Sequence, residues 1–297
     1  MSSNAAAAAD TALFNPIRVG NITLSHRVAL APLTRCRNTA EHVPTDLTLE
    51  HYVQRASTPG TLLITEATIV HPKAGGWAHA PGIYNEEQVQ AWKKIVEAVH
   101  ARGSHIFLQL WALGRSADPA LLTSEGNYPY VAPSPIGLSE ESEHMPGGPT
   151  PRPLTIPEIR EYVTWFGDAA LRAAHPSLAY LHFIEPRMDG SGDAFISESS
   201  AGSGNDFARK IWAPRPFVSA GGYDGKTARY VADRYGDIIA FGRHFIANPD
   251  LPRRIKDDME YNRYDRSTFY SVLEPKGYTD YPFAAVEAVR EGLVAAS

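Results

Sequence analysis

The chain has 297 residues, of which 43% are hydrophobic and 21% charged, and its formal net charge at pH 7 is −5. A chain of this length and apolar content can bury the core of one large domain: a barrel of roughly 250 residues would use most of it, and two smaller domains are the alternative. The negative net charge, without a cluster of lysines and arginines, argues against a nucleic-acid-binding protein, because nucleic-acid phosphates require a basic surface.

Cysteine content and hydropathy predict the cellular environment. Cys36 is the single cysteine, so no internal disulfide can form and a reducing compartment is expected. We interpret Cys36 as a packed residue rather than a nucleophile. Residues 1–12 lack the basic and apolar regions of a secretory signal and are expected to form a flexible tail. No run reaches the ~18 apolar residues of a membrane span. We therefore expect a cytoplasmic monomer or homodimer that binds a small molecule, with neither nucleic acid nor a membrane as partner.

The first part of the chain predicts alternating strands and helices. Gly20-Asn21 predicts a hairpin-like turn, and the apolar run 27–32 predicts the first strand. A helix is expected over 49–56 and a second strand over 61–68. Residues 86–102 carry apolar side chains at the helical period, which predicts an amphipathic helix, and residues 105–111 form the third strand.

After a long interruption the alternation resumes. Residues 114–153 are rich in proline, glycine, serine and glutamate and show no period, which favours a capping loop over a domain linker. A helix from Thr155 to about Ala174 follows, beginning with a capping-box pattern. The remaining predicted elements are strands over 178–186, 216–222 and 237–243 and helices over 205–212 and 226–235. Strands that alternate with helices imply a parallel sheet, so we predict one domain over 1–297: a TIM-type (β/α) barrel truncated to about six of eight strand–helix units.

Two predicted strand ends carry residues suited to a planar ligand. In α/β barrels the ligand lies at the C-terminal ends of the strands. Gln109 can both donate to and accept from a heterocycle, and Trp111 can cover an apolar ligand. Thr34 offers a hydroxyl after the first strand. Each of these residues can instead be an ordinary packing or loop residue.

The last two strands end in glycines. Ala220-Gly221-Gly222 and Phe241-Gly242-Arg243 combine backbone that can approach a ligand closely with a guanidinium that matches a phosphate. In such barrels a phosphate often lies between the loops that follow these strands. No metal-ligand spacing, P-loop or nucleophile elbow is present. A phosphate-bearing ligand is therefore the favoured prediction, with ordinary turns as the alternative.

Several longer motifs together resemble the Old Yellow Enzyme family, fungal branch, over residues 13–283. They are Leu13-Phe-Asn-Pro with Gly20-Asn21, Ala31-Pro-Leu-Thr-Arg35, Arg55-Ala-Ser with Pro59-Gly60, Ile64-Thr-Glu-Ala-Thr68, Phe107-Leu-Gln-Leu-Trp-Ala-Leu-Gly-Arg115, Ala220-Gly-Gly222, Phe241-Gly-Arg243 with Ala247-Asn-Pro-Asp-Leu251, Tyr264-Asp-Arg-Ser-Thr-Phe-Tyr270, and Gly277-Tyr-Thr-Asp-Tyr-Pro282. The resemblance implies an FMN-dependent ene-reductase that uses NADPH to reduce a small enone or enal, in fungal secondary metabolism.

The resemblance also implies site residues. The isoalloxazine would contact Pro32, Leu33, Thr34, Ala67 and Gln109, and the ribityl phosphate would be held by Gly222, Gly242 and Arg243. Trp111 and Tyr270 would line the substrate pocket. Thr34 and Tyr270 are the candidate catalytic residues.

The sequence departs from the family in one place. The family has two further strand–helix units where only His175-Pro176-Ser177 stands here. With them the family's carbonyl-binding His/Asn strand end, its proton-donating tyrosine and the arginine at the flavin N1 edge are absent. Because such polar groups stabilise transition-state charge, a non-reducing isomerase or cyclase, or a catalytically impaired member of the fold, is the alternative. A coding sequence that lacks an exon is a third explanation.

His182 is a separate case. It lies on the strand that now follows the third one, where the family presents its substrate-binding histidine. Tyr180, His182 and Ile184 share one face of that strand. The resemblance places a histidine in this pattern without a substrate role. We therefore interpret His182 as a packed strand residue, with recruitment to the substrate as the alternative.

Overall fold

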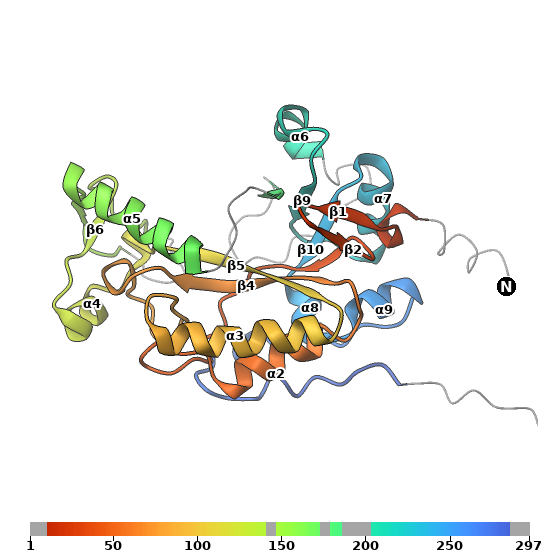
Figure 1. The fold of residues 1–297 in the computed structure, drawn as a ribbon, viewed down its shortest axis with the longest axis horizontal. Coiled ribbons are helices and arrows are strands. Elements are labelled where there is room, and N and C mark those ends of the chain that lie inside the picture. Colours follow the sequence, from red (N-terminus) through yellow and green to blue (C-terminus); the bar gives the residue numbers. More distant parts are fainter. Residues whose placement is uncertain (1–10, 141–146, 173–178, 186–202, 286–297) are drawn as a thin grey trace, which may run out of the picture.

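A six-stranded, all-parallel sheet organises the molecule. The computed structural model describes residues 11–140, 147–172, 179–185 and 203–285. The strands lie in the order β5-β4-β3-β10-β9-β8 (Figure 1). Their bounds are β3 Val28–Leu30, β4 Leu62–Ile69, β5 His105–Trp111, β8 Leu181–Ile184, β9 Phe217–Ala220 and β10 Ile238–Phe241. Within the described ranges β5 pairs only with β4 and β8 only with β9, so the sheet does not close. The prediction of a truncated (β/α) barrel is confirmed.

Helices cover the outer face of this sheet, and α2 and α3 lie side by side beneath β4 (Figure 1). The α-helices are α2 Asp46–Arg55, α3 Glu86–Ala101, α4 Pro119–Gly126, α5 Ile156–Arg172, α6 Asp206–Trp212, α7 Gly225–Tyr235, α8 Arg243–Ala247 and α9 Leu251–Lys256. Asn85 caps α3 through a capping box with Gln88, which explains its sharp start. α2 begins at Asp46, before the predicted residue 49, because the Thr45 side chain accepts a hydrogen bond from the Thr48 N–H.

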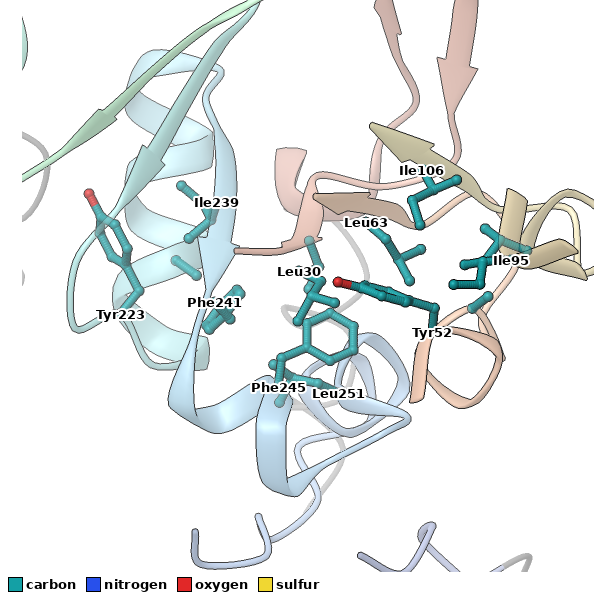
Figure 2. Packing of buried hydrophobic residues seen from close by; sticks show 14 of the residues in the cluster. Leu30, Tyr52, Leu63, Ile95, Ile106, Tyr223, Ile239, Phe241, Phe245 and Leu251 are labelled. Carbon is teal, nitrogen blue, oxygen red and sulfur yellow. The ribbon is translucent and has the colours of Figure 1, made fainter. Parts of the chain in front are cut away.

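The four central strands β4, β3, β10 and β9 are buried on both faces, and alternate residues along the sheet separate two cores. Leu30, Leu63, Ile106 and Phe241 face the helices, where they pack with Tyr52 and other helical side chains (Figure 2). Ala29, Ala31, Leu62 and Ile64 point the other way, into the barrel. A buried Leu or Ile contributes roughly 1.5–3 kcal/mol, so the two cores together hold the strand ends in fixed positions.

A hairpin covers the N-terminal end of the barrel. Its strands are β1 (Ile17–Val19) and β2 (Ile22–Leu24), and they pair antiparallel. Gly20 adopts the left-handed φ of +58° that the tight turn requires, as the sequence predicted. Val19 and Leu24 pack against the inner core.

One aromatic contact spans the gap in the barrel. Phe107 of β5 and Tyr180, which precedes β8, stack with their ring centroids 5.7 Å apart and their planes 8° apart. The two edge strands are therefore connected through side chains rather than through a backbone ladder.

The predicted capping loop, 114–153, contains secondary structure that the sequence analysis did not expect. α4 starts where the Asp118 carboxylate accepts hydrogen bonds from the Ala120 and Leu121 N–H groups, with Pro119 at the first helical position. The two-residue strands β6 (Val131–Ala132) and β7 (Arg152–Pro153) pair in parallel. Leu113, Ala117 and Leu122 pack with Ile69 at the C-terminal end of β4. The segment therefore lies against the end of the barrel where ligands are expected.

The N-terminal end of the described chain is attached to α7, and short 3₁₀ helices connect several of the other elements. Residues 1–10 of the predicted tail lie outside the described residues, whereas Thr11 Oγ1 and the Ala12 N–H both donate to Asp233. The 3₁₀ helices are η1 Ala12–Phe14, η2 Pro72–Ala74, η3 Gly114–Ser116, η5 Ser203–Asn205 and η6 Arg266–Thr268. None of the helices described has both the length and the apolar content needed to span a membrane.

Candidate active site

The sheet order brings the predicted cofactor residues into one arc of adjacent strand ends. Ala67 of β4 and Gln109 of β5 are register partners. The Ala31 N–H, just before Pro32, donates to the Phe241 carbonyl, just before Gly242, at 3.0 Å. Gly222 follows β9, the next strand. Five strands that are consecutive in sheet order carry these residues within or just after their C-terminal ends, in the order Gln109, Ala67, Pro32-Leu33-Thr34, Gly242-Arg243 and Gly222.

A bulge in β4 sets the direction of the side chains at one end of this arc. The register shifts between Ile64 and Ala67, and Thr65 Oγ1 accepts a hydrogen bond from the Gln109 N–H at 3.0 Å. Gln109 itself is exposed, so its amide is available to a ligand. Bulges often occur beside functional sites because they reorient side chains in this way.

Glycine is required at the other end of the arc. Gly222 has a φ of +66°, in the left-handed region that favours glycine. At Gly242 a Cβ atom would lie 3.3 Å from Leu33 Cδ2, so a larger residue would press on the Leu33 side chain. Arg243, half-buried, follows directly as the first residue of α8. Two glycine-containing backbone segments, together with the Arg243 guanidinium, suit a phosphate group.

An aromatic wall stands beside the arc. Trp77 lies between Trp111 and Tyr270, with ring centroids 5.9 Å and 6.3 Å away respectively. The Trp77 Nε1–H donates to Cys36 Sγ at 3.3 Å, and burial raises the pKa of that thiol. Cys36 is buried, as interpreted from the sequence. Trp111 and Tyr270, predicted to line one pocket, are thus brought together by a residue that the sequence analysis did not identify.

A buried carboxyl connects the segment that follows β3 with the bulged part of β4. Glu66 Oε2 accepts hydrogen bonds from the Arg35 N–H at 3.2 Å and from Asn38 Nδ2 at 3.4 Å. Burial raises the Glu66 pKa to about 7, and the contacts from Arg35 and Asn38 only partly oppose that rise. Arg35 adjoins Thr34 and Glu66 adjoins Ala67, so this contact holds the two segments together. A charged residue within the apolar run 61–68 was the available signal, and the sequence analysis did not use it.

The arrangement can hold an elongated, planar molecule with a phosphate at one end. Trp111 of the aromatic wall lies at the β5 end of the arc, Thr34 lies in the middle after β3, and the glycines lie at the other end after β10 and β9. Among the residues in the described ranges, no group of three or more His, Cys, Asp and Glu side chains could hold a metal ion. The catalytic roles of Thr34 and Tyr270 stay predictions; Thr34 is half-buried and Tyr270 is 50% exposed.

Comparison with known proteins finds a matching family, similar curated proteins and similar solved structures. The model of the NADH:flavin oxidoreductase / NADH oxidase family matches residues 12–177 and 174–262. Chanoclavine-I aldehyde reductase fgaOx3 of Penicillium roqueforti is 34% identical, over 93% of this chain and 97% of that protein. The protein named "Probable inactive reductase easA" of Epichloe festucae var. lolii is 31% identical, over 92% of this chain and 95% of that protein. The crystal structure of Old Yellow Enzyme from Pichia sp. AKU4542 is similar with a TM-score of 0.77 and 31% identity, covering 93% of this chain and 94% of that chain.

The same comparisons locate the missing units. The two segments matched by the family model meet at residues 174–177, where the sequence analysis placed them. The alignment with the Penicillium protein runs over 368 positions, but 93% of this 297-residue chain is about 276 residues. About 90 aligned positions therefore have no counterpart in this chain, which is enough for two strand–helix units.

Proposed function

Because this chain belongs to the NADH:flavin oxidoreductase / NADH oxidase family, the family of Old Yellow Enzyme, we propose that it holds FMN along the strand-end arc and reduces an activated carbon–carbon double bond with NADPH. Bound FMN would carry the hydride from the nicotinamide to that bond. The substrate would be a small enone or enal. The single observation that supports the proposal best is the order of the eight residues along five adjacent strands.

In this proposal the residues of the arc and of the aromatic wall contact different parts of FMN and of the substrate. Gln109 and Thr34 would hydrogen bond the isoalloxazine edge, while Pro32, Leu33 and Ala67 would pack against its ring. Gly222, Gly242 and Arg243 would hold the phosphate. Trp77, Trp111 and Tyr270 would keep water away from the substrate and orient its apolar body. We further propose that the protein works in the cytoplasm, as a monomer or homodimer.

A second candidate function rests on the missing units. The family's carbonyl-binding and proton-donating groups lie on strands that this chain lacks, and one relative at 31% identity is named an inactive reductase. Without those groups the arc could serve a non-reducing isomerisation or cyclisation, or binding alone. In this alternative the strand-end arc still binds its ligand, but the protein does not catalyse a reduction.

An assay of the FMN-loaded protein separates the two candidates. With NADPH and 2-cyclohexen-1-one under nitrogen, we expect FMN-dependent formation of cyclohexanone, measured by gas chromatography. The rate should be at least a hundredfold below that of a complete family member, because one lost transition-state hydrogen bond alone costs ~10²–10³ in rate. If loaded protein gives no more cyclohexanone than free FMN, the reductase proposal fails and the non-reducing candidate is favoured.

A further inference from the structure

The gap in the barrel leaves a groove that the proposed function does not use. The groove has a volume of about 840 Å³ and runs around the free edge of β5, between α3, α5 and the start of β8. Its lining includes Trp92, Phe107, Leu108, Ala170, Tyr180 and His182. None of the eight cofactor positions is among the lining residues. The volume lies in the range of small-molecule sites.

One buried polar group in the groove wall has no partner: no residue of the described ranges forms a hydrogen bond with His182 Nε2. The hydroxyl-bearing side chain of Tyr180 lies on the same wall. The ring centroids of these two residues lie 6.5 Å apart. Burial lowers the His182 pKa to about 4 and raises the Tyr180 pKa to about 12, so both groups are neutral at pH 7. A buried polar group without a partner is costly, and native structures contain few of them.

The rest of the wall is apolar or already paired. Trp92, Phe107 and Leu108 supply aromatic and aliphatic surface. Lys93 and Glu97 pair with each other at 3.9 Å, and Arg172 Nη1 donates to the Ile83 carbonyl at 3.0 Å. The cations lining the groove therefore have partners, which disfavours an anionic ligand.

We propose that this groove is a second ligand site, for a neutral, mainly apolar small molecule that carries a carbonyl or hydroxyl oxygen. The oxygen would hydrogen bond with Tyr180 and His182, and the apolar body would lie against Phe107, Trp92 and Leu108. Such a ligand would occupy the groove beside the free edge of β5 and give the buried His182 Nε2 a hydrogen-bond partner. His182 would thus bind a ligand in the groove, away from the strand-end arc. The site does not depend on FMN or on the reductase proposal.

The test uses the full chain and Prodan, a neutral naphthalene ketone whose emission shifts to the blue in apolar surroundings. We expect saturable, one-site binding with a blue shift. The double variant Tyr180→Phe/His182→Leu, which keeps the apolar volume, should weaken binding at least tenfold. Ala170→Trp, which fills the groove from α5, should abolish it. Tyr128→Phe removes a hydroxyl outside the groove and should leave the affinity unchanged, as should added FMN.

Thermal melts first establish that each variant is folded. Binding that survives unchanged in both Tyr180→Phe/His182→Leu and Ala170→Trp would overturn the proposal, as would the absence of saturable binding. Competition by FMN would place the probe in the strand-end arc instead and overturn it too. The remaining alternative is that a second copy of the chain, not a small molecule, covers the groove. Sedimentation tests it by measuring the oligomeric state: a dimer that becomes monomeric on Ala170→Trp would favour the second copy and overturn the proposal.

Discussion

Replacing Arg55 by alanine should lower the free energy of unfolding by about 3–5 kcal/mol, the largest effect expected from one side chain outside the apolar core. The guanidinium is fully buried and donates to four carbonyls, those of His51, Phe245, Ile246 and Tyr278, at 2.6–3.2 Å. Alanine removes this donor from all four carbonyls, of which the Tyr278 carbonyl keeps its contact with His51 Nδ1, and it opens a cavity, so the loss is costly.

Urea unfolding followed by circular dichroism measures this effect. Arg102→Ala is the matched control, because Arg102 is exposed and its removal should change stability by less than about 0.5 kcal/mol. Arg55→Lys should fall between the two, since one ammonium cannot reach all four carbonyls. Equal unfolding midpoints for Arg55→Ala and Arg102→Ala would show that the buried network contributes little. Because Arg55 holds the carbonyls of α8, the alanine variant should also lose affinity for FMN.

Glu66→Gln should become more stable relative to the parent, by about 2–3 kcal/mol, as the pH rises from 5 to 8. In the folded protein burial raises the Glu66 pKa from its ordinary value of 4.5 to about 7. Between those two values the folded chain holds a proton that the unfolded chain has released, so the parent loses stability as the pH rises through this window. Glutamine carries no such proton and can still accept the hydrogen bonds from Arg35 and Asn38.

The measurement compares urea unfolding of parent and variant at several pH values. Burial lowers the pKa of His26 and His182 to about 4, so these histidines also make stability depend on pH, but they do so equally in both proteins. The difference between the two curves of unfolding free energy against pH therefore measures the contribution of the Glu66 carboxyl alone. Parallel profiles from pH 5 to 8 would mean that the carboxyl ionises in the fold as it does in water.

The arc was predictable because parallel strands of a barrel bring their C-terminal ends together. Gln109, Gly222 and Gly242 could be placed at strand ends from local apolar runs alone, without knowing any tertiary contact. The start of α3 at Glu86 was predicted to the residue, whereas α2, capped by Thr45, begins three residues before its predicted start. The truncation to six strands followed from comparing the number of strand–helix units with the eight of a complete barrel.

Residues that act through long-range contacts could not be found in this way. Trp77 lies in a connection without periodicity, and its place between Trp111 and Tyr270 depends on how three distant segments pack. Arg35 and Arg55 have no local signal of burial, because arginine is usually exposed. α8 and α9 are short, and their helical conformation depends on tertiary packing more than on sequence pattern.

Five adjacent strand ends should still bind FMN in this chain, although the strand that carries the family's arginine at the flavin N1 edge is absent. Titration of the purified chain with FMN, followed by quenching of flavin fluorescence, tests it directly. We predict saturable binding with a micromolar or weaker Kd, since one charged hydrogen bond of ~1.5–3 kcal/mol corresponds to a roughly ten- to hundredfold loss. Riboflavin, which lacks the phosphate, and the Arg243→Ala variant should both bind more weakly. No saturable quenching, or stoichiometric retention of FMN through gel filtration, would contradict the account.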